Sequence, residues 1–335
     1  MVTKYHQMEK IDFVILWVDD TDPEWQSVYS HYSKLEFGDA RSVCFRDWGT
    51  LKYWFRGVEC FTPWVNKVFF VTCGHYPEWL NLDCQKLRFV KHSDFIPSEY
   101  LPTFSSHTIE LNLHRIDGLS DKFVYFNDDT FIINNTPQSR FFKDGVPCDM
   151  AVLNAIQPIG TAFEHIKANN IALINKIFHK KETIRKNWTK WFNPVYGTEL
   201  LRTFGLLGFP YFTGFLDPHL PNPFLKKSFA DVWNTFEESL HKTCLHKFRS
   251  IEDVNQYIIR YVQLLHGDFH PINIKKTSVA LPVNNNLNRL SDIIKHQSKS
   301  IVCINDSDVD DFNNYRKQLI NAFESILPNK SLFEL

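Results

Sequence analysis

The chain has few of the features that mark secreted or membrane-spanning proteins. Its seven cysteines form no CxxC pair and follow no regular spacing, so they favour reduced thiols over a zinc site or a disulfide framework. No stretch approaches the roughly 18 apolar residues of a membrane span, and the opening MVTKYHQMEK lacks the apolar core of a signal peptide. The cysteines are Cys44, Cys60, Cys73, Cys84, Cys148, Cys244 and Cys303.

The chain also has no large excess of positive or negative charge. The 37 Lys and Arg residues against 38 Asp and Glu residues give a formal net charge of −1, so no global field attracts nucleic acid or an anionic membrane. We expect no nucleic-acid partner, although a local basic pocket is compatible with this balance. What the chain does have is apolar residues. Of its 335 residues, 44% are hydrophobic and 15% aromatic, enough for one large domain or a domain with a substantial insertion.

Short apolar runs alternate with turn-rich or amphipathic segments in the first part of the chain. Between the first two runs, RDWGTLKYWFRGVECFTPW has the apolar spacing of a helix that ends at Pro63. This alternation predicts βα units around a mostly parallel sheet, in which ligands bind at the carboxyl ends of the strands. The runs of strand length and composition are IDFVILWV (11–18), KVFFVTCG (67–74), LRFVKH (87–92) and KFVYFN (122–127).

The pattern becomes helical between about Gly160 and Gly267, where AFEHIKANNIALINKIFHKK and SIEDVNQYIIRYVQLLHG carry apolar residues three and four apart. Ser250 and Asp253 resemble a capping box at the start of the second helix. The aromatic stretch between them, FGLLGFPYFTGFLDPHLPNPF, predicts a loop packed over the body of the protein.

The last part of the chain returns to the first pattern. KSIVCIND predicts a strand and VDDFNNYRKQLINAFESIL an amphipathic helix, while NNNLNRLSD predicts a mobile connection. We therefore expect an α/β domain interrupted by a helical insertion. Its divisions are 1–155 for the α/β portion, 156–275 for the insertion and 276–335 for the strand and helix that complete the domain.

Paired acidic residues at strand ends are the first candidates for chemistry. In KFVYFNDDTFIINN, Asp128 and Asp129 follow an apolar run, where two neighbouring carboxylates repel each other and are costly to bury unless a cation pairs them. Taken alone, the commoner explanation is an acidic turn or a helix N-cap. A second pair, Asn305 and Asp306, ends the last strand, and clustered oxygens at two strand ends are what a hard cation such as Mg²⁺ needs.

A further acidic strand end lies near the start, in VILWVDDTDPEW. Asp19 or Asp20 could bind a ribose hydroxyl or a uracil edge, with Trp17 as a stacking surface. An Asp-rich turn is the alternative, and we prefer it for Asp22, which precedes Pro23.

Ser106, Glu110 and His114 recur at four-residue intervals, so they share one face if LPTFSSHTIELNLHRI is helical. A solvated helix face is the alternative to a site. In favour of a site, the face begins just after the Pro102 turn, where a helix N-terminus can attract phosphate.

A histidine and an arginine in the insertion are the candidates for proton and charge transfer. His219 lies between two prolines, which stiffen the backbone, and histidine has the pKa range suited to general acid or base catalysis. A lone histidine is more often structural. Arg249, at a helix start, could clamp a phosphate, although a surface arginine is the ordinary alternative.

Taken together, these segments resemble the Stealth family. This family comprises bacterial capsule and cell-wall polysaccharide hexose-1-phosphate transferases and polymerases, and the eukaryotic N-acetylglucosamine-1-phosphotransferase that marks lysosomal enzymes. Its four conserved blocks occur in order and cover most of the chain. The segments that carry the resemblance are IDFVILWVDDTDPEW, FRDWGTLKYWFRGVECFTPWVNKVFFVTCGHYPEWLN, HSDFIPSEYLPTFSSHTIELNLHRIDGLSDKFVYFNDDTF, PHLP, HKFRSIEDV and VCIND.

The resemblance implies a Rossmann-like, glycosyltransferase-A-like α/β fold with a large helical insertion, in which 1–155 binds a nucleotide sugar and 156–275 carries the catalytic His and Arg. The implied reaction transfers a sugar 1-phosphate from a UDP-sugar, such as a UDP-N-acetylhexosamine or UDP-hexose, to a saccharide hydroxyl and releases UMP. The implied cofactor is Mg²⁺ or Mn²⁺. Because acceptors in the family are often lipid-linked, we expect the cytoplasm or the inner face of the membrane as the location.

The resemblance carries family positions over to Ser106, Glu110, Asp128, Asp129, His219 and Arg249, with the roles of His219 and Arg249 interchangeable. The other expected site residues come from the sequence pattern. The expected catalytic residues are His219, Arg249 and Asp129. The expected metal ligands are Asp128, Asp129, Asn305 and Asp306. The expected substrate-binding residues are Trp17, Asp19, Asp20, Arg56, Ser106, Glu110, His114 and Arg115.

Two rival functions stay open. A conventional metal-dependent glycosyltransferase would have the same acidic strand ends but would release UDP. A non-catalytic carbohydrate-binding module would use the many aromatic residues as stacking platforms. The stretch from Thr198 to Gly214 is unlike the family, which leaves the choice of acceptor open.

Overall fold

The computed structural model of the chain describes residues 9–34, 46–157, 162–307 and 309–335. Cys44 and the expected boundary at Gly160 lie outside these ranges. The six cysteines within them are all free thiols, as their spacing predicts.

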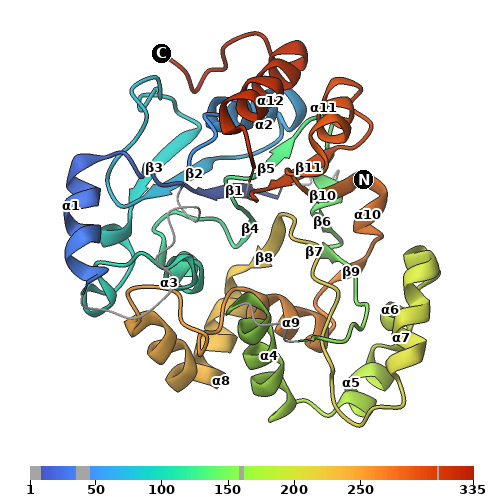
Figure 1. Cartoon of the computed structure of the whole chain (residues 1–335). Coiled ribbons are helices and arrows are strands. Elements are labelled where there is room, and N and C mark those ends of the chain that lie inside the picture. The colour runs from blue at the N-terminus through green and yellow to red at the C-terminus, as the bar shows by residue number, and fades with distance from the viewer. Residues whose placement is uncertain (1–8, 35–45, 158–161, 308) are drawn as a thin grey trace, which may run out of the picture.

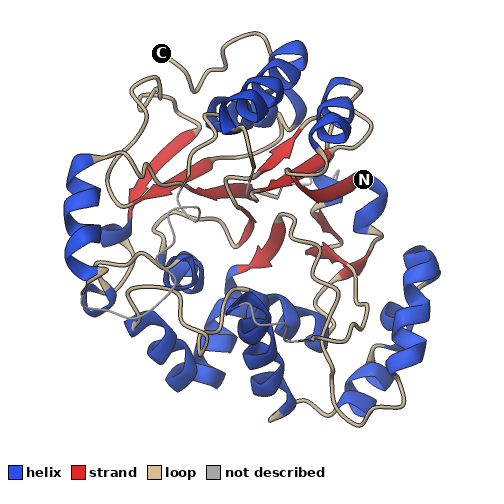
Figure 2. Cartoon of the chain, in the orientation of Figure 1, coloured by secondary structure: helices blue, strands red, loops and turns tan. Residues whose placement is uncertain are grey.

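A five-stranded sheet with the order β3-β2-β1-β4-β8 forms the centre of the protein (Figure 2). The first four strands are parallel, and β8 pairs antiparallel with β4. Strands β1, β2 and β4 are buried along almost their whole length, because continuous apolar runs suit strands covered on both faces. The mostly parallel sheet and its four parallel strands are confirmed. The bounds are β1 Ile11–Leu16, β2 Val68–Thr72, β3 Leu87–Lys91, β4 Lys122–Phe126 and β8 Asn222–Leu225.

Two three-stranded sheets adjoin the main sheet, with the orders β10-β11-β5 and β6-β7-β9. The first joins the two acidic strand ends. Strand β5 follows Asp129 directly and pairs antiparallel with β11, and the Ile304 amide donates to the Asp129 carbonyl oxygen at 2.8 Å. The bounds are β5 Thr130–Ile132, β6 Phe142–Lys143, β7 Val146–Asp149, β9 His270–Pro271, β10 Ser278–Pro282 and β11 Ile301–Asn305.

Helices cover the main sheet from both sides (Figure 1). Helices α2 and α12 lie on one side, and α3, α4, α8 and α9 lie on the other. Helices α5, α6 and α7 form the margin remote from α1. The bounds are α1 Pro23–Tyr32, α2 Leu51–Phe61, α3 Ser106–Asn112, α4 Ala162–Asn175, α5 Lys180–Lys186, α6 Trp188–Trp191, α7 Leu200–Leu206, α8 Lys226–Leu245, α9 Tyr257–His266, α10 Ile274–Thr277, α11 Leu287–Lys295 and α12 Phe312–Ile326.

Two predictions of secondary structure were wrong: the start of one helix and the nature of one connection. Asp253 does accept the Ser250 amide at 2.9 Å, but α9 begins only at Tyr257, because the intervening turn is held by contacts to other elements. The expected mobile connection 284–292 instead contains most of α11, which buries Leu290 and Ile294. Tertiary burial there outweighs the weak helix propensity of asparagine.

The expected insertion is tied to the main sheet at two places. Strand β8, within 156–275, pairs with β4, and β9 pairs with β7. The division of the chain at residues 155 and 275 stays a prediction. Within the described ranges, no helix is long and apolar enough to cross a membrane.

Candidate active site

A cavity of about 590 Å³ opens where β1, β4 and β11 end. Its opposite side is formed by α3, the loop before β8 and the turn before α9. Ligands of parallel sheets bind at this strand edge, as the sequence predicts. The structure brings nine predicted residues together around the cavity: Trp17, Ser106, Glu110, Asp128, Asp129, His219, Arg249, Asn305 and Asp306.

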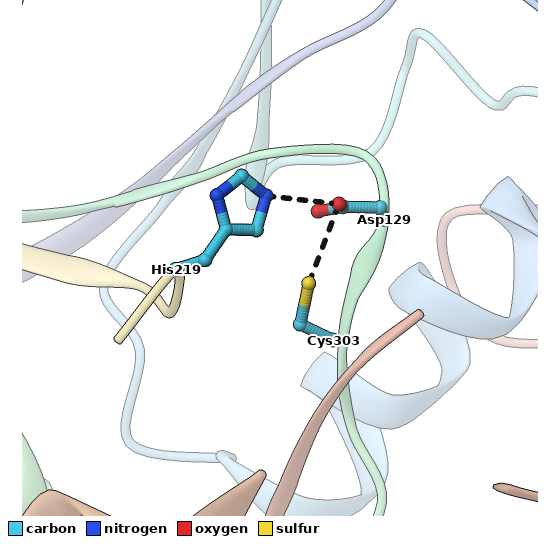
Figure 3. A group of neighbouring side chains, drawn as sticks. All are labelled: Asp129, His219 and Cys303. Atoms are coloured by element: carbon cyan, nitrogen blue, oxygen red, sulfur yellow. Dashed lines mark hydrogen bonds and ion pairs between the residues drawn. The ribbon is translucent and has the colours of Figure 1, made fainter. Parts of the chain in front are cut away.

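Asp129 is the centre of a three-residue group (Figure 3). Its carboxylate pairs with His219 Nε2 at 3.1 Å and accepts the Cys303 thiol at 3.3 Å. Burial alone would raise the pKa of Asp129, but the hydrogen bonds from His219, Cys303 and Thr130 outweigh it and lower that pKa. Burial would lower the pKa of His219, but the bond to Asp129 outweighs it and raises that pKa. The contact therefore stabilises the ionised carboxylate of Asp129 and also stabilises the imidazolium of His219 whenever that ring is protonated.

The His219 backbone is held in an uncommon conformation by its loop. Its φ of 46° lies in the left-handed region, which costs a non-glycine residue free energy. Two residues earlier, Asp217 accepts hydrogen bonds from Arg260 at 2.7 Å and Tyr261 at 2.6 Å. Arg260 is fully buried and also pairs with Asp149 at 2.8 Å, so α9 and β7 together fix the loop that carries His219.

Arg249 is positioned by a second buried network. Its guanidinium donates to the Ser106 hydroxyl at 2.9 Å, at the start of α3. The turn after Arg249 is closed by Asp253, which accepts bonds from His107 at 3.0 Å and His246 at 2.6 Å. Among the described residues, no carboxylate forms an ion pair with Arg249. A positive charge is therefore left facing the cavity.

Glu110 lies beside these groups on α3. The Tyr125 hydroxyl lies 3.1 Å from the Glu110 carboxylate and 2.7 Å from the Asn127 side-chain oxygen, so these two acceptors share the single hydroxyl proton. The side chain is buried at 5% exposure, so the alternative of a solvated helix face does not hold at this position. Glu110 thereby links α3 to the end of β4.

Asp128 differs from Asp129 in its hydrogen-bond partners and in the direction of its pKa shift. Within the described part of the chain, no other residue donates a hydrogen bond to its carboxylate, and only its own backbone amide and the charge of Arg249 offset its negative charge in part. The carboxylate reaches the open cavity, but the surrounding walls displace much of its hydration. That desolvation, with the negative charges of Asp129 and Asp47, raises the pKa of Asp128 to about 7. No cation among the described residues forms an ion pair with Asp128.

Asp306 already has a cation. Arg46 contacts its carboxylate through two guanidinium nitrogens, and the Arg46 guanidinium also lies 4.8 Å from the Phe312 ring centroid. Asn305 lines the cavity with an exposed side chain. Of the four predicted metal ligands, Asp129 and Asp306 therefore have positively charged or thiol partners. Asp128 and Asn305 have no such partner among the residues that the structure describes.

The donor chemistry fits a hard divalent cation at Asp128. Its unpaired carboxylate, with Asp47 and Asn305 at the same cavity, offers the oxygen ligands that Mg²⁺ and Mn²⁺ prefer. The ligand atoms of Asp129, His219 and Cys303 lie within 4.8 Å of one another, but their oxygen, nitrogen and sulfur set suits a softer metal.

Asp19 and Asp20 do not line the cavity, although Trp17 does. Asp19 accepts the amide and hydroxyl of Thr21, and Asp22 caps α1 through the Trp25 amide at 2.7 Å. The alternative of an Asp-rich turn thus describes this segment. Burial, and then Asp19 and Asp47, raise the pKa of Asp20.

Three further predicted substrate-binding residues lie away from the cavity. Arg56, on α2, pairs with Glu334 at 2.8 Å and so ties α2 to the C-terminus. The His114 ring stacks on Phe229, and burial, with the charge of Arg115, lowers the pKa of His114 to about 4. Arg115 lies over the Trp233 ring. These contacts give all three residues structural roles. Their predicted role in substrate binding stays a prediction, because none of them lines the cavity.

Sequence reasoning missed four residues of the site: Arg46, Asp47, Asp217 and Arg260. Two of them left a signal in the sequence. Asp47 starts an Asp-x-Gly turn, in which its side chain accepts the Gly49 amide at 2.8 Å. Arg260 interrupts the apolar helix YIIRYVQLLHG, and an arginine in such a run is rarely buried without a partner.

Comparisons with known proteins identify relatives of the chain. Residues 9–34 match Stealth protein CR1, conserved region 1, and residues 44–149 match Stealth protein CR2, conserved region 2. The chain is 40% identical over 331 residues to the capsular polysaccharide phosphotransferase WcwK of Streptococcus pneumoniae, covering 98% of each chain. It is also 40% identical to the exopolysaccharide phosphotransferase cps2G of Lactiplantibacillus plantarum, covering 97% of this chain and 96% of the relative.

A solved structure of the galactosyltransferase LgtC with donor and acceptor sugar analogs is also similar. The similarity has a TM-score of 0.39 and 12% sequence identity, and it covers 94% of this chain and 96% of LgtC.

Proposed function

The chain belongs to the Stealth family and is a phosphotransferase, and from that premise we propose that it transfers a sugar 1-phosphate from a UDP-sugar to a saccharide hydroxyl. The products are a phosphodiester and UMP. The reaction belongs to capsular or cell-wall polysaccharide biosynthesis, in the cytoplasm or at the inner face of the membrane, where the acceptor is free or lipid-linked.

One observation carries this proposal. Among the described residues, the cavity presents a carboxylate in no ion pair, Asp128, on one side and an arginine in no ion pair with a carboxylate, Arg249, on the other. A diphosphate bridged by a divalent cation has both charges that these residues need: the cation satisfies the carboxylate, and the phosphate oxygens satisfy the guanidinium. A neutral saccharide alone would satisfy neither of them.

On the donor side, Asp128 would hold Mg²⁺ or Mn²⁺ together with Asp47 and Asn305. When bound, such an ion would neutralise the negative charge that develops on the leaving UMP. Arg249 binds the oxygens of the transferred phosphoryl group, with its orientation fixed by Ser106. Trp17, at the end of β1, contributes an aromatic wall near the nucleotide.

On the acceptor side, Asp129 orients His219 through Nε2, which leaves Nδ1 for the acceptor hydroxyl. Asp129 would stabilise the imidazolium that forms when His219 takes the hydroxyl proton, as a carboxylate does in an Asp–His pair. The Cys303 thiol donates to the same carboxylate and restrains its rotation.

The bond balance follows from the products. The acceptor oxygen forms a new bond to the phosphorus next to the sugar, and the bond from that phosphorus to the bridging oxygen breaks. UMP leaves with this oxygen, and the acceptor proton goes to His219. Because no bond to the anomeric carbon changes, the anomeric configuration of the donor is retained.

The test is the identity of the released nucleotide. The purified protein is incubated with UDP-N-acetylglucosamine or a UDP-hexose, Mg²⁺ and saccharide acceptors, and the nucleotides are separated by chromatography. UMP that disappears with EDTA supports the proposal. Release of UDP would instead identify a conventional glycosyltransferase and overturn the mechanism. No donor turnover, together with no rise in Tm on addition of UDP and Mg²⁺, would point instead to a carbohydrate-binding module.

A further inference from the structure

A group of large apolar side chains is exposed far from the cavity. Within the described part of the chain, seven large hydrophobic side chains are more than half exposed, and five of them lie between residues 188 and 211. Removing such side chains from contact with water is favourable. A contiguous exposed group of them therefore marks a binding surface. They are Trp188 at 61%, Leu201 at 72%, Phe204 at 52%, Phe209 at 53% and Tyr211 at 65%.

Ring stacking and helical spacing bring the first part of this group together. Trp188 and Phe192 are four residues apart, one turn along α6 and its end, so they share a face. The Phe192 ring stacks on Phe204 with a centroid distance of 5.6 Å. Leu201 is one turn before Phe204 on α7.

The remaining residues are attached by backbone contacts. The Lys180 ammonium, at the start of α5, donates to the carbonyl oxygens of Leu206 at 2.6 Å and Phe209 at 2.9 Å. Asn175, at the end of α4, pairs with the backbone of Phe212, next to Tyr211. Helices α5, α6 and α7 lie on the margin of the molecule remote from α1 (Figure 1), and none of these residues lines the cavity.

The same segment is strongly basic. Residues 176–211 contain seven Lys and Arg residues and two Glu residues, a balance of +5, whereas the whole chain carries −1. Two of the seven, Lys180 and Lys190, donate to backbone carbonyls within the fold. The other five are exposed: Lys176, Lys181, Arg185, Lys186 and Arg202.

Exposed aromatic and aliphatic side chains in a segment with many exposed basic ones match the chemistry of an anionic bilayer surface. Aromatic rings insert at the headgroup level, while Lys and Arg pair with lipid phosphates. A protein partner fits less well, because lysine is depleted in protein interfaces. We propose that residues 176–211, here called the 176–211 surface, dock the protein on a membrane rich in anionic lipid.

The experiment measures vesicle binding by the full-length protein without substrate, so its outcome is independent of the proposed function. Co-sedimentation is compared for vesicles of phosphatidylcholine alone and with phosphatidylglycerol added. Wild type should bind the anionic vesicles, and salt should weaken that binding. A Lys181→Gln, Arg185→Gln, Lys186→Gln variant should bind at least about tenfold more weakly, because each basic residue at a membrane surface contributes about 1 kcal/mol.

A second variant tests the apolar part. Trp188→Ser, Leu201→Ser and Tyr211→Ser together remove the three most exposed side chains, leave the Phe192–Phe204 stack intact, and should weaken vesicle binding at least about tenfold. Circular dichroism melting checks that both variants fold.

Matched changes elsewhere serve as controls and should leave vesicle binding unchanged. The basic control is Arg289→Gln, Lys295→Gln, Lys317→Gln, which alters net charge equally. The apolar control is Tyr76→Ser, Leu82→Ser, Leu335→Ser. Equal vesicle binding by wild type and both 176–211 variants would overturn the proposal. Absence of vesicle binding, with a dimer in light scattering that the apolar variant abolishes, would also overturn it and assign the surface to a second copy of the chain.

Discussion

The two sides of the cavity are built in different ways. One side, the acidic wall, comes from strand ends and the turn before α2, and the other, the cationic wall, comes from the insertion. The acidic wall consists of Asp47, Asp128, Asp129, Asn305 and Asp306. The cationic wall consists of His219 and Arg249.

The acidic wall follows largely from local chain direction, because a residue just after a buried parallel strand must emerge at the ligand-binding edge. The cationic wall has no such local rule. His219 is placed by the Arg260–Asp217 contact and Arg249 by the turn that Asp253 closes. The comparison indicates that substitutions far from the cavity should disturb the acidic wall little. Substitutions in the Arg260–Asp217 contact or in the turn closed by Asp253 should displace the cationic wall.

The largest expected effect is at the cationic wall itself. His219→Ala should lower kcat by about 10²–10⁴-fold, the range for a general acid or base, with little change in donor affinity. The measurement is UMP release together with UDP-sugar binding. His296→Ala removes an exposed histidine outside the cavity and should leave both unchanged. Unchanged turnover in His219→Ala would remove this residue from the mechanism.

The second change removes a support of that wall. Arg260→Met leaves Asp149 and Asp217 buried without their cation, which should lower the free energy of unfolding by about 3–5 kcal/mol. Urea unfolding measures this loss, and kcat should also fall because the His219 loop is released. Arg202→Met removes an exposed arginine and should change stability little. Full activity in a destabilised Arg260→Met variant would show that the loop positions His219 without this contact.

The third change separates the acidic wall from the cationic one. Without metal, Asp128→Asn should raise Tm, because it removes one of two neighbouring carboxylates that repel each other. The same variant should lose most of the Tm increase that Mg²⁺ and UDP give to wild type, since ligand binding stabilises the native state. The exposed control Asp292→Asn should keep that increase. An Asp128→Asn variant with an intact Mg²⁺ response would place the cation elsewhere.

The smallest expected effect concerns pH and the turn that holds Arg249. The hydrogen bond to Asp253 raises the pKa of His246 when the protein is folded. This contribution to stability is fully present below the unfolded pKa of about 6.5 and is lost as pH rises through the folded pKa. Asp253, whose pKa is lowered by its histidine partners against the effect of burial, stays ionised over this range.

The free energy of unfolding of wild type should therefore fall more steeply as pH rises above about 6.5 than that of His246→Gln. Urea unfolding across this range measures the two slopes. His296→Gln, at an exposed site, should keep the wild-type slope. Identical slopes in wild type and His246→Gln would mean that the Asp253 contact does not couple to folding.

The sequence predicted the strands and acidic ends well because their signals are local. A buried run of strand length predicts β4, and its end predicts where Asp128 and Asp129 emerge. Helix faces were harder. The spacing of Ser106, Glu110 and His114 describes a common face, but α3 ends at Asn112 and His114 turns to pack on Phe229.

Basic residues were the least predictable. Arg56 and Arg249 look alike in sequence, yet Arg56 is 7% exposed and pairs with Glu334, which lies 278 residues away along the chain. Which arginine is neutralised depends on which carboxylate the fold brings beside it. The spacing of apolar residues along the sequence does not predict a pairing between residues so far apart in the chain.

The sequence by itself determined the parallel sheet, the edge of the sheet at which the cavity opens and the acidic residues placed there, because strand burial and chain direction are local properties. Only the tertiary structure decided which of these charges are compensated. Arg46 neutralises Asp306 and His219 pairs with Asp129, while Asp128 keeps an uncompensated charge. The electrostatic cost of a carboxylate depends on its distance to other charges and to water, and those distances exist only once the chain has folded.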